Sequence, residues 1–505
     1  MDQASSDKEH TEPNAERATR NPPPATFNTA LFVVLCLLIL AGWAALYRWY
    51  SLPAHWSTPK FALDKVPGHF RSPQILATLA LFVGLGLLYA LGYWLLRRAA
   101  HISRTLRWAI LGLAVGSAAV NVLLYPISAI DVFSYVFEMK LPLVYHLNPY
   151  LAPLDVVTAT DPLTGFSSFF HAPLGYGPAW VVLSALPSWL TGFDNLLRAL
   201  LGVKLFSLLF VALIGGVIYA YHDEQRGRWL GLYLFLCNPW LLFEAVANAH
   251  NDVLMAAFLM AAALALKKRP WAALPLLTLA CLIKPFAAAL VPVYLWALLR
   301  QRWTRRQVVA TLTLSALLVL AVTLPFWADG GMLSGMRTAV EVQQTLRTAS
   351  LYSVLDEQLV LHHAPHSAQV ALRLGGVALF ALLAAWIMWK CRDVERALAY
   401  VLLLFFLLVS SLYSWYLIPI VGLLALRRER LDTAYAVLAP TLALALYPLD
   451  VWAWFNSGFN GPKVHLFEAV FLAAPALALL LAQGVRGWNG TGGGRVSGDG
   501  QRVVG

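Results

Sequence analysis

The chain has 505 residues, of which 59% are hydrophobic and only 12% are charged. This charged fraction is about half of the roughly 25% in soluble domains, and many apolar runs reach the roughly 20 residues that cross a bilayer. The formal net charge of +11 does not indicate a nucleic-acid partner, because the basic residues cluster in short loops between apolar runs. That distribution follows the positive-inside rule. The composition therefore predicts an all-α polytopic membrane protein and excludes an ordinary soluble domain.

The two ends of the chain differ from its centre. Residues 1–26 are polar and proline-rich and lack the apolar core and cleavage site of a signal peptide, so we expect a disordered cytoplasmic tail. Residues 27–484 are predicted to form a single integral membrane domain, followed by a glycine-rich flexible tail at 485–505. The four cysteines show no metal-ligand spacing and suggest neither a disulfide framework nor a zinc site.

About 14 transmembrane helices are expected. The apolar segments are 27–47, 74–96, 107–125, 197–221, 229–247, 253–266, 271–299, 308–327, 368–389, 397–426, 431–449 and 465–484. We count 271–299 and 397–426 twice, because each is too long for one ordinary span. The first is broken at Lys284-Pro285, and the second is expected to turn near 413–419. The first is predicted to be a hairpin with Lys284 at its outer turn, and its short arms would place this lysine in an indentation of the outer face.

Segment 173–193 decides the topology. If it crossed the membrane, the basic loops 222–228, 267–270 and 427–430 would all face outward. If it lies along the outer surface, they all face the cytoplasm. Its glycines and prolines suit a broken element, so we expect interfacial helices in a first large outer loop at 126–196.

With this topology, polar side chains from distant segments collect on the outer side. The candidate site residues are Asp131, Tyr135, Glu138, Tyr176, His250, Asn251, Asp252, Lys284, Arg337 and Tyr413. Arg337 belongs to a second, polar outer loop at 328–367. Because ionisable groups at membrane depth are costly, their convergence on one face predicts a functional site there.

The stretch from Asp131 to Tyr150 is central to this site. Read as a helix, it places Asp131, Tyr135 and Glu138 on one face, because residues three and four apart are neighbours on a helix. The alternative for Asp131 is a capping box, with Ser128 as the N-cap residue.

The other candidates have structural alternatives of their own. Asn251 and Asp252 would cap the helix that follows them, and Lys284 would snorkel to the headgroups. Trp415 and Tyr416 are interpreted as interfacial belt aromatics.

The residue types suit one chemistry. Group transfer from a lipid-phosphate donor needs a carboxylate that takes a proton from the acceptor hydroxyl. It also needs a cation that stabilises the departing phosphate. Asp131, Asp252 and Lys284 supply both kinds of group.

Four motifs carry a resemblance to a known family. They are IDVFSYVFEMKLPLVYHLNPY, APLGYGPAW, NAHNDVLM and LIKPFAAALVPVYLW, in this order. Together they resemble polyprenyl-phosphate-sugar-dependent glycosyltransferases of the GT-C type, in particular the bacterial α-1,6-mannopyranosyltransferases that build lipoglycan mannan backbones. The likeness runs from about residue 107 to 300 and more diffusely to about 465.

The resemblance implies a GT-C-like fold in the bacterial plasma membrane, with the active site on its outer face. It implies inverting transfer of a hexose, mannose above all, from a polyprenyl-phosphate sugar to a glycan or glycolipid acceptor. Asp131 would be the catalytic base or orient the acceptor, Asp252 matches the second acidic position, and Lys284 matches a basic residue near the donor phosphate. One departure is Phe133, which gives DVFSY where DVYSY is frequent. No cofactor is certain; members of the class differ in metal use, and no His/Asp cluster here indicates a divalent metal.

The sequence is also compatible with two other classes of membrane protein. Broken helices and intramembrane charges also mark secondary transporters and lipid-linked-sugar flippases. However, the charges here collect at one face, and no second half mirrors the first. A non-catalytic membrane subunit is the third alternative, which two acidic motifs and a lysine disfavour.

Overall fold

The computed structural model describes residues 29–57, 73–129, 131–157, 161, 172–391, 393–456 and 462–486. The predicted tail at 1–26 lies outside these ranges, as does the predicted tail at 485–505 except for its first two residues.

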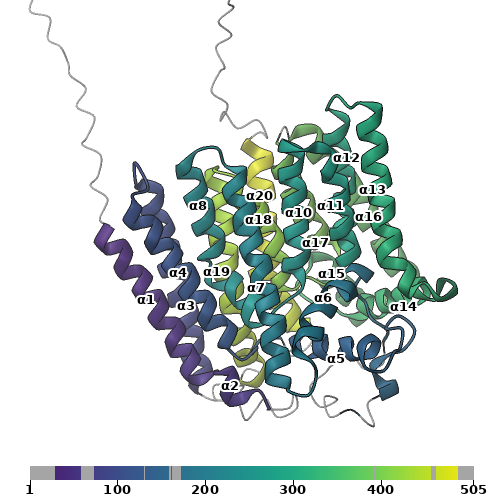
Figure 1. Ribbon diagram of the computed structural model, residues 1–505, viewed down its shortest axis with the longest axis horizontal. Coiled ribbons are helices and arrows are strands. Elements are labelled where there is room, and N and C mark those ends of the chain that lie inside the picture. Colours follow the sequence, from purple (N-terminus) through teal and green to yellow (C-terminus); the bar gives the residue numbers. More distant parts are fainter. Residues whose placement is uncertain are drawn as a thin grey trace, which may run out of the picture.

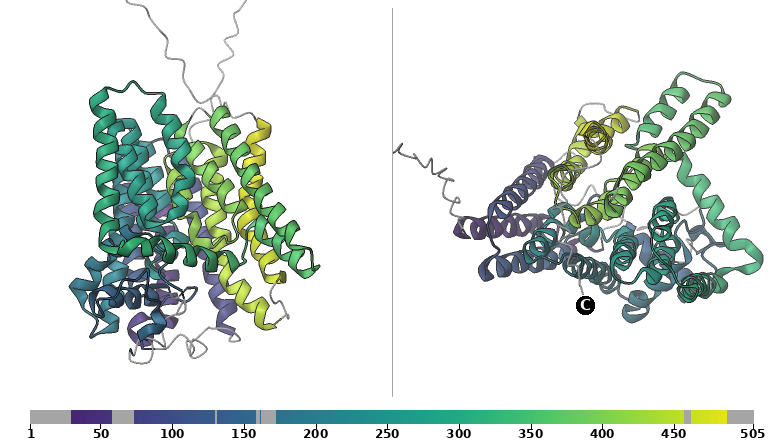
Figure 2. Two further views of the ribbon diagram at one scale, coloured as in Figure 1. Left: turned by 90° about the vertical axis from the view of Figure 1, so that its right-hand side faces the viewer. Right: turned by 90° about the horizontal axis from the view of Figure 1, so that it is seen from above.

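The named elements of the described residues are all helices, and the longer ones stand side by side as a bundle (Figures 1 and 2). The first ten are α1 Thr29–Trp49, α2 Leu52–His55, α3 Pro73–Arg98, α4 Arg104–Leu123, α5 Asp131–Leu143, α6 Pro178–Thr191, α7 Leu196–Tyr221, α8 Gln225–Leu236, α9 Pro239–Leu242 and α10 Asp252–Lys268. The next ten are α11 Ala273–Ile283, α12 Val291–Leu299, α13 Arg305–Thr323, α14 Gly331–Thr345, α15 Leu351–Leu361, α16 His366–Lys390, α17 Val394–Leu408, α18 Ile418–Ala425, α19 Arg430–Asn456 and α20 Pro462–Arg486. The short elements that matter for the site are the π-helix η4 Phe243–Ala247 and the 3-10 helices η6 Pro285–Leu290 and η9 Ser414–Leu417.

Within the described residues, eight helices are long and apolar enough to cross a membrane, or nine if one bent pair forms a single span. The eight are α1, α3, α4, α7, α13, α16, α19 and α20. The bent pair joins α8 to α9 and the π-helix with a 52° bend. These helices confirm the prediction of an all-α polytopic membrane protein. The count of about 14 crossings stays a prediction, because the remaining helices of the predicted spans have only 8 to 17 residues.

The basic loops meet at one end of the bundle. The hydrogen bonds that join them are Arg226 Nη2 to the Arg97 carbonyl at 2.6 Å, Lys267 Nζ to Asp223 Oδ2 at 2.7 Å and Arg428 Nη1 to Glu224 Oε2 at 2.6 Å. Loops far apart in the sequence, from Arg97 to Arg428, therefore share one face. This is the arrangement expected if 173–193 does not cross the membrane.

Helix α6 agrees with that topology. It has 14 residues, which rise only about 21 Å at 1.5 Å per residue, short of the roughly 30 Å bilayer core. It packs against α5, α7 and α11. Figure 1 shows α5, α6 and α14 towards one end of the bundle, with the start of α8 and the end of α12 at the other.

The predicted polar loop at 328–367 is largely helical, because α14 and α15 occupy most of it. Helix α14 approaches the chain that follows α5 closely, since a Cβ atom at Gly335 would lie 1.8 Å from the Tyr150 carbonyl oxygen. The Asn148 side chain also donates a hydrogen bond to the Phe326 carbonyl at 3.0 Å. The two predicted outer loops are thus packed together.

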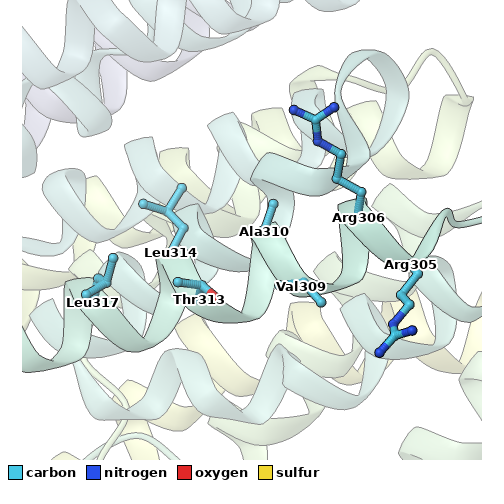
Figure 3. A pocket seen from close by; sticks show the side chains of 7 residues that line it. All are labelled: Arg305, Arg306, Val309, Ala310, Thr313, Leu314 and Leu317. Atoms are coloured by element: carbon cyan, nitrogen blue, oxygen red, sulfur yellow. The ribbon is translucent and has the colours of Figure 1, made fainter.

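Two of the long apolar helices are packed against few other side chains of the protein. Helix α13 buries only Thr311, and α16 buries only Ala384 and Ile387. Figure 3 shows α13, where two arginines are followed by mostly apolar side chains. These side chains line a cavity of about 590 Å³. Its lining residues are Arg305, Arg306, Val309, Ala310, Thr313, Leu314 and Leu317. An apolar surface with cations at one end is typical of a helix that faces lipid.

Candidate active site

A cavity of about 460 Å³ brings half of the predicted site residues together. Its polar lining includes Asp131, Glu138, Tyr176, Lys284, Ser411, Tyr413, Trp415 and Tyr416. Its apolar lining includes Phe286, Val340, Val342, Leu346, Phe405, Phe406 and Val409, contributed by η6, α14 and the end of α17. The cavity therefore joins two carboxylates and a lysine to an aromatic and aliphatic wall.

Helix α5 positions the first carboxylate. It begins at Asp131, and every residue from Val132 to Leu141 is buried. The Ser128 hydroxyl lies 2.6 Å from Asn248 Nδ2, and the helix starts three residues beyond Ser128, so the capping-box alternative does not describe this helix. Asp131 is left with 22% of its side chain exposed, on the cavity wall.

The other members of the predicted α5 face are buried. The Tyr135 ring packs edge-on against Trp180, with centroids 4.8 Å apart. Glu138 is 8% exposed, and its Oε2 atom has no hydrogen-bond partner among the residues that the structure describes. Burial and the nearby Asp131 charge raise the pKa of Glu138 well above its usual range. Glu138 is thus suited to the protonated form, in which a carboxyl group donates a hydrogen bond.

His250 lies between two carboxylates. Its Nδ1 atom is 3.3 Å from Asp131 Oδ2, and its Nε2 atom is 3.4 Å from Glu244 Oε2. The imidazole is fully buried and stacks on Trp415, with centroids 3.9 Å apart and planes 14° from parallel. Burial alone would lower the pKa of His250, but the two carboxylates outweigh it and raise the pKa to about 9. This position also shows that the belt interpretation of Trp415 is wrong.

Asp252 and Lys284 form a second buried charge pair. Lys284 Nζ lies 2.6 Å from Asp252 Oδ2, and the two side chains are 8% and 0% exposed. Helix α10 begins at Asp252, and the preceding Asn251 makes no side-chain capping bond. Both the capping and the snorkelling alternatives are therefore wrong. The ammonium group also lies 5.4 Å from the centroid of Tyr176 and 5.4 Å from that of Tyr416, so aromatic rings surround it.

Some predicted residues stand apart from the cavity. Asn251 is fully buried behind it, and its backbone nitrogen contacts the Tyr135 hydroxyl at 3.5 Å. Asp252 reaches the cavity only through Lys284. Arg337 is 81% exposed and pairs with Glu341 at 2.8 Å, so the structure does not bring it to the other candidates. The contact of Arg337 with the substrate stays a prediction, and its exposed position disfavours it.

Two functional candidates were absent from the predicted set. Glu244 is 3% exposed and belongs to the site, whereas Lys204 is 0% exposed and binds the carbonyls of Leu124 and Ala247. Glu244 is the single charged residue of the predicted span 229–247, and Lys204 lies inside the predicted span 197–221, whose other charged residue, Arg198, is at its start. A charged residue within an apolar span is costly and therefore indicates a functional or structural role, so the sequence could have pointed to Glu244 and Lys204.

Gly177 fixes the approach of the 172–177 segment to Lys284. Its N–H donates to the Ile283 carbonyl at 2.9 Å, and a Cβ atom there would lie 2.1 Å from the Leu282 carbonyl oxygen. Gly177→Ala is therefore expected to destabilise the protein by about 1–3 kcal/mol through overpacking. Thermal unfolding in detergent measures this. Gly175→Ala is the matched control, because its Cβ would meet only Ala339 at 3.4 Å; equal losses in the two variants would contradict the prediction.

Within the ranges that the structure describes, no group of three or more histidine, cysteine, aspartate or glutamate side chains is placed to hold a metal ion.

Fold and site together define a polytopic membrane protein with a charged, partly apolar cavity built by segments far apart in the sequence. The sequence profile described as "Alpha-(1->6)-mannopyranosyltransferase, N-terminal domain" matches residues 32–300, more than half of the chain, and the chain belongs to this family. The matched region runs from α1 to α12 and contains Asp131, Glu244, His250 and Lys284.

Two relatives support this membership. The chain is 26% identical over 314 residues to alpha-(1->6)-mannopyranosyltransferase A of Mycobacterium tuberculosis, across 58% of this chain and 60% of that protein. It is 29% identical over 203 residues to a probable alpha-(1->6)-mannopyranosyltransferase of Mycolicibacterium smegmatis, across 38% of this chain and 33% of that protein. The chain thus spans less than two thirds of the length of either relative.

Proposed function

We propose that this protein is a hexosyltransferase of the bacterial plasma membrane that transfers mannose from a polyprenyl-phosphate sugar to a glycan or glycolipid acceptor. The observation that carries the proposal is the shared cavity, which presents the Asp131 carboxylate and the Lys284 ammonium beside an apolar wall. The names of the two relatives favour mannose over other hexoses.

In the proposed reaction, Asp131 takes the proton of the acceptor hydroxyl. The acceptor oxygen forms a bond to the anomeric carbon of the sugar as the bond between that carbon and the phosphate oxygen breaks. The electron pair of the broken bond leaves with the lipid monophosphate, and the Lys284 ammonium stabilises this charge. Attack opposite the phosphate inverts the anomeric carbon.

The two walls of the cavity suit the two ends of such a donor. Phe286, Phe405 and Phe406 offer an apolar surface for the first isoprene units. Tyr176 and Tyr413 also line the cavity, and we assign their hydroxyl groups to hydrogen bonds with the sugar. Asp252 holds Lys284 in place by its 2.6 Å contact, so we assign it a part in donor binding that acts through the lysine.

The orientation in the membrane follows from charge. Because the basic loops meet at one end of the bundle, the positive-inside rule assigns that end to the cytoplasm. Helices α5, α6 and α14 lie towards the other end (Figure 1), so the reaction is proposed to occur at the outer face.

The test is transfer in proteoliposomes that contain the purified full chain. Polyprenyl-phosphate mannose, polyprenyl-phosphate glucose and a soluble nucleotide mannose are offered separately with a short α-mannoside acceptor. Mannosylated product from the lipid donor alone is the expected result, with an α-linkage determined by NMR. Transfer from the nucleotide sugar, or exchange of labelled solute across liposomes without any product, would overturn the proposal; the second outcome would indicate a transporter.

A further inference from the structure

Glu244 is the most connected buried carboxylate of the site. It lies on the π-helix and is 3% exposed. Its Oε2 atom accepts a hydrogen bond from Asn248 Nδ2 at 2.8 Å, and its Oε1 atom accepts one from Ser414 Oγ at 2.6 Å. Its Oε2 atom also faces His250 Nε2 at 3.4 Å. One side chain thus joins the π-helix, the turn before α10 and η9.

These hydrogen bonds do not explain why an ionisable side chain occupies this position. An uncharged acceptor could hold Ser414, and a buried carboxylate away from water is costly unless a cation accompanies it. His250 is the group within ion-pair distance of Glu244. The same imidazole faces Asp131 Oδ2 with its other nitrogen.

The backbone next to His250 has an unusual conformation and a second contact with Glu244. Ala249 has a φ of 56°, in the left-handed region that residues other than glycine rarely adopt. The His250 N–H donates to the Glu244 carbonyl at 3.1 Å, so Glu244 contacts both the backbone and the side chain of the histidine. Strained backbone and π-helical turns both concentrate at functional sites.

We propose that Glu244 is a positioning residue that holds His250 as an imidazolium between itself and Asp131. The imidazolium in turn holds the Oδ2 atom of Asp131 and so fixes this carboxylate in the wall of the cavity. This inference rests on the proposed function, in which Asp131 receives the acceptor proton. It assigns Glu244 a role that acts through His250 and requires no contact with the sugar.

The charge state of His250 has a defined pH range. The groups in direct contact with His250 are Asp131 from α5, Glu244 from the π-helix and Trp415 from η9. The titratable groups around them are Tyr135 from α5, Asp252 from α10 and Lys284, which pairs with Asp252. Because the pKa is raised in the folded state to about 9, protonation stabilises the fold fully below about pH 6.5, the usual histidine pKa. This stabilisation is lost as the pH rises through about 9.

The experiment compares wild type, Glu244→Gln and Glu395→Gln in two measurements between pH 5 and 10. Glu395 is a partly buried carboxylate at the end with the basic loops, where it accepts a hydrogen bond from Tyr221, and it is the matched carboxylate-to-amide control. In Glu244→Gln, kcat is expected to fall about 10- to 100-fold with little change in KM. The alkaline limb of its kcat profile moves to lower pH, because His250 loses a carboxylate partner. Glu395→Gln keeps the wild-type profile.

The second measurement does not depend on activity. The gap in Tm between wild type and Glu244→Gln is expected to narrow as pH rises from about 6.5 to about 9, whereas the gap for Glu395→Gln stays constant. A pH-independent gap together with an unshifted alkaline limb would overturn the inference. If wild type transfers no sugar, the proposed function fails while the Tm comparison still decides the role of Glu244.

Two further variants test the inference if Glu244→Gln does not fold. Should Glu244→Gln not insert into the membrane, Glu244→Asp retains the charge and is expected to keep the wild-type alkaline limb. His250→Gln is expected to lose that limb. A limb that persists in His250→Gln would equally overturn the inference.

Discussion

Asp131→Asn is expected to lower kcat for sugar transfer by about 10²- to 10⁴-fold, the range for loss of a general base. The amide matches the carboxylate in shape but cannot take the acceptor proton. Since Asp131 lines the cavity and is 22% exposed, folding and membrane insertion should survive. Transfer by the purified variant in proteoliposomes measures the effect.

Glu341→Gln is the control for this variant. Glu341 is a carboxylate on α14 that is 58% exposed and pairs with Arg337. It does not itself line the cavity, although its neighbours Val340 and Val342 do. Its activity should stay within about twofold of wild type, since exposed ion pairs contribute little. Full activity of Asp131→Asn would remove Asp131 from the proposed mechanism.

Lys284→Met is expected to have two separable effects. It leaves Asp252 buried without its cation, which costs about 3–5 kcal/mol for a broken buried pair. It also removes the positive charge proposed to contact the donor phosphate, so the apparent KM for the lipid donor should rise and kcat should fall. Thermal unfolding and donor titration measure the two effects independently.

The double variant Lys284→Met/Asp252→Asn separates structure from chemistry. Removing both charges should restore most of the lost stability, because a neutral pair carries no uncompensated charge. Donor use should stay impaired. Recovery of normal donor KM in the double variant would show that Lys284 acts only by neutralising Asp252, and its phosphate role would then be abandoned.

Much of the fold was predictable because its cause is local. An apolar run of about 20 residues has few alternatives to a transmembrane helix, and the predicted segments 74–96 and 197–221 correspond closely to α3 and α7. The breaks at Lys284-Pro285 and near 413–419 were also visible, because proline ends a helix. The helices of 328–367 were missed, since their polar sequence lacks a span's hydropathy.

The site was predictable as a set of residues and only partly as an arrangement. Asp131, Glu138, Tyr176, Lys284 and Tyr413 do line one cavity. Arg337 was chosen for its charge and outer position alone, and it points to Glu341 instead. The i,i+4 spacing of Arg337 and Glu341 indicates this pair only once the segment is known to be helical.

The class of the protein can be read from its amino-acid sequence alone. So can the approximate ends of its main helices and the cost of every charge placed within them. Those properties depend on hydropathy, local propensity and desolvation, which act residue by residue. The partners of these charges, in contrast, are set by the fold. It set Asp252 against Lys284 and His250 between Asp131 and Glu244, because ion pairs between distant segments depend on how the helices pack.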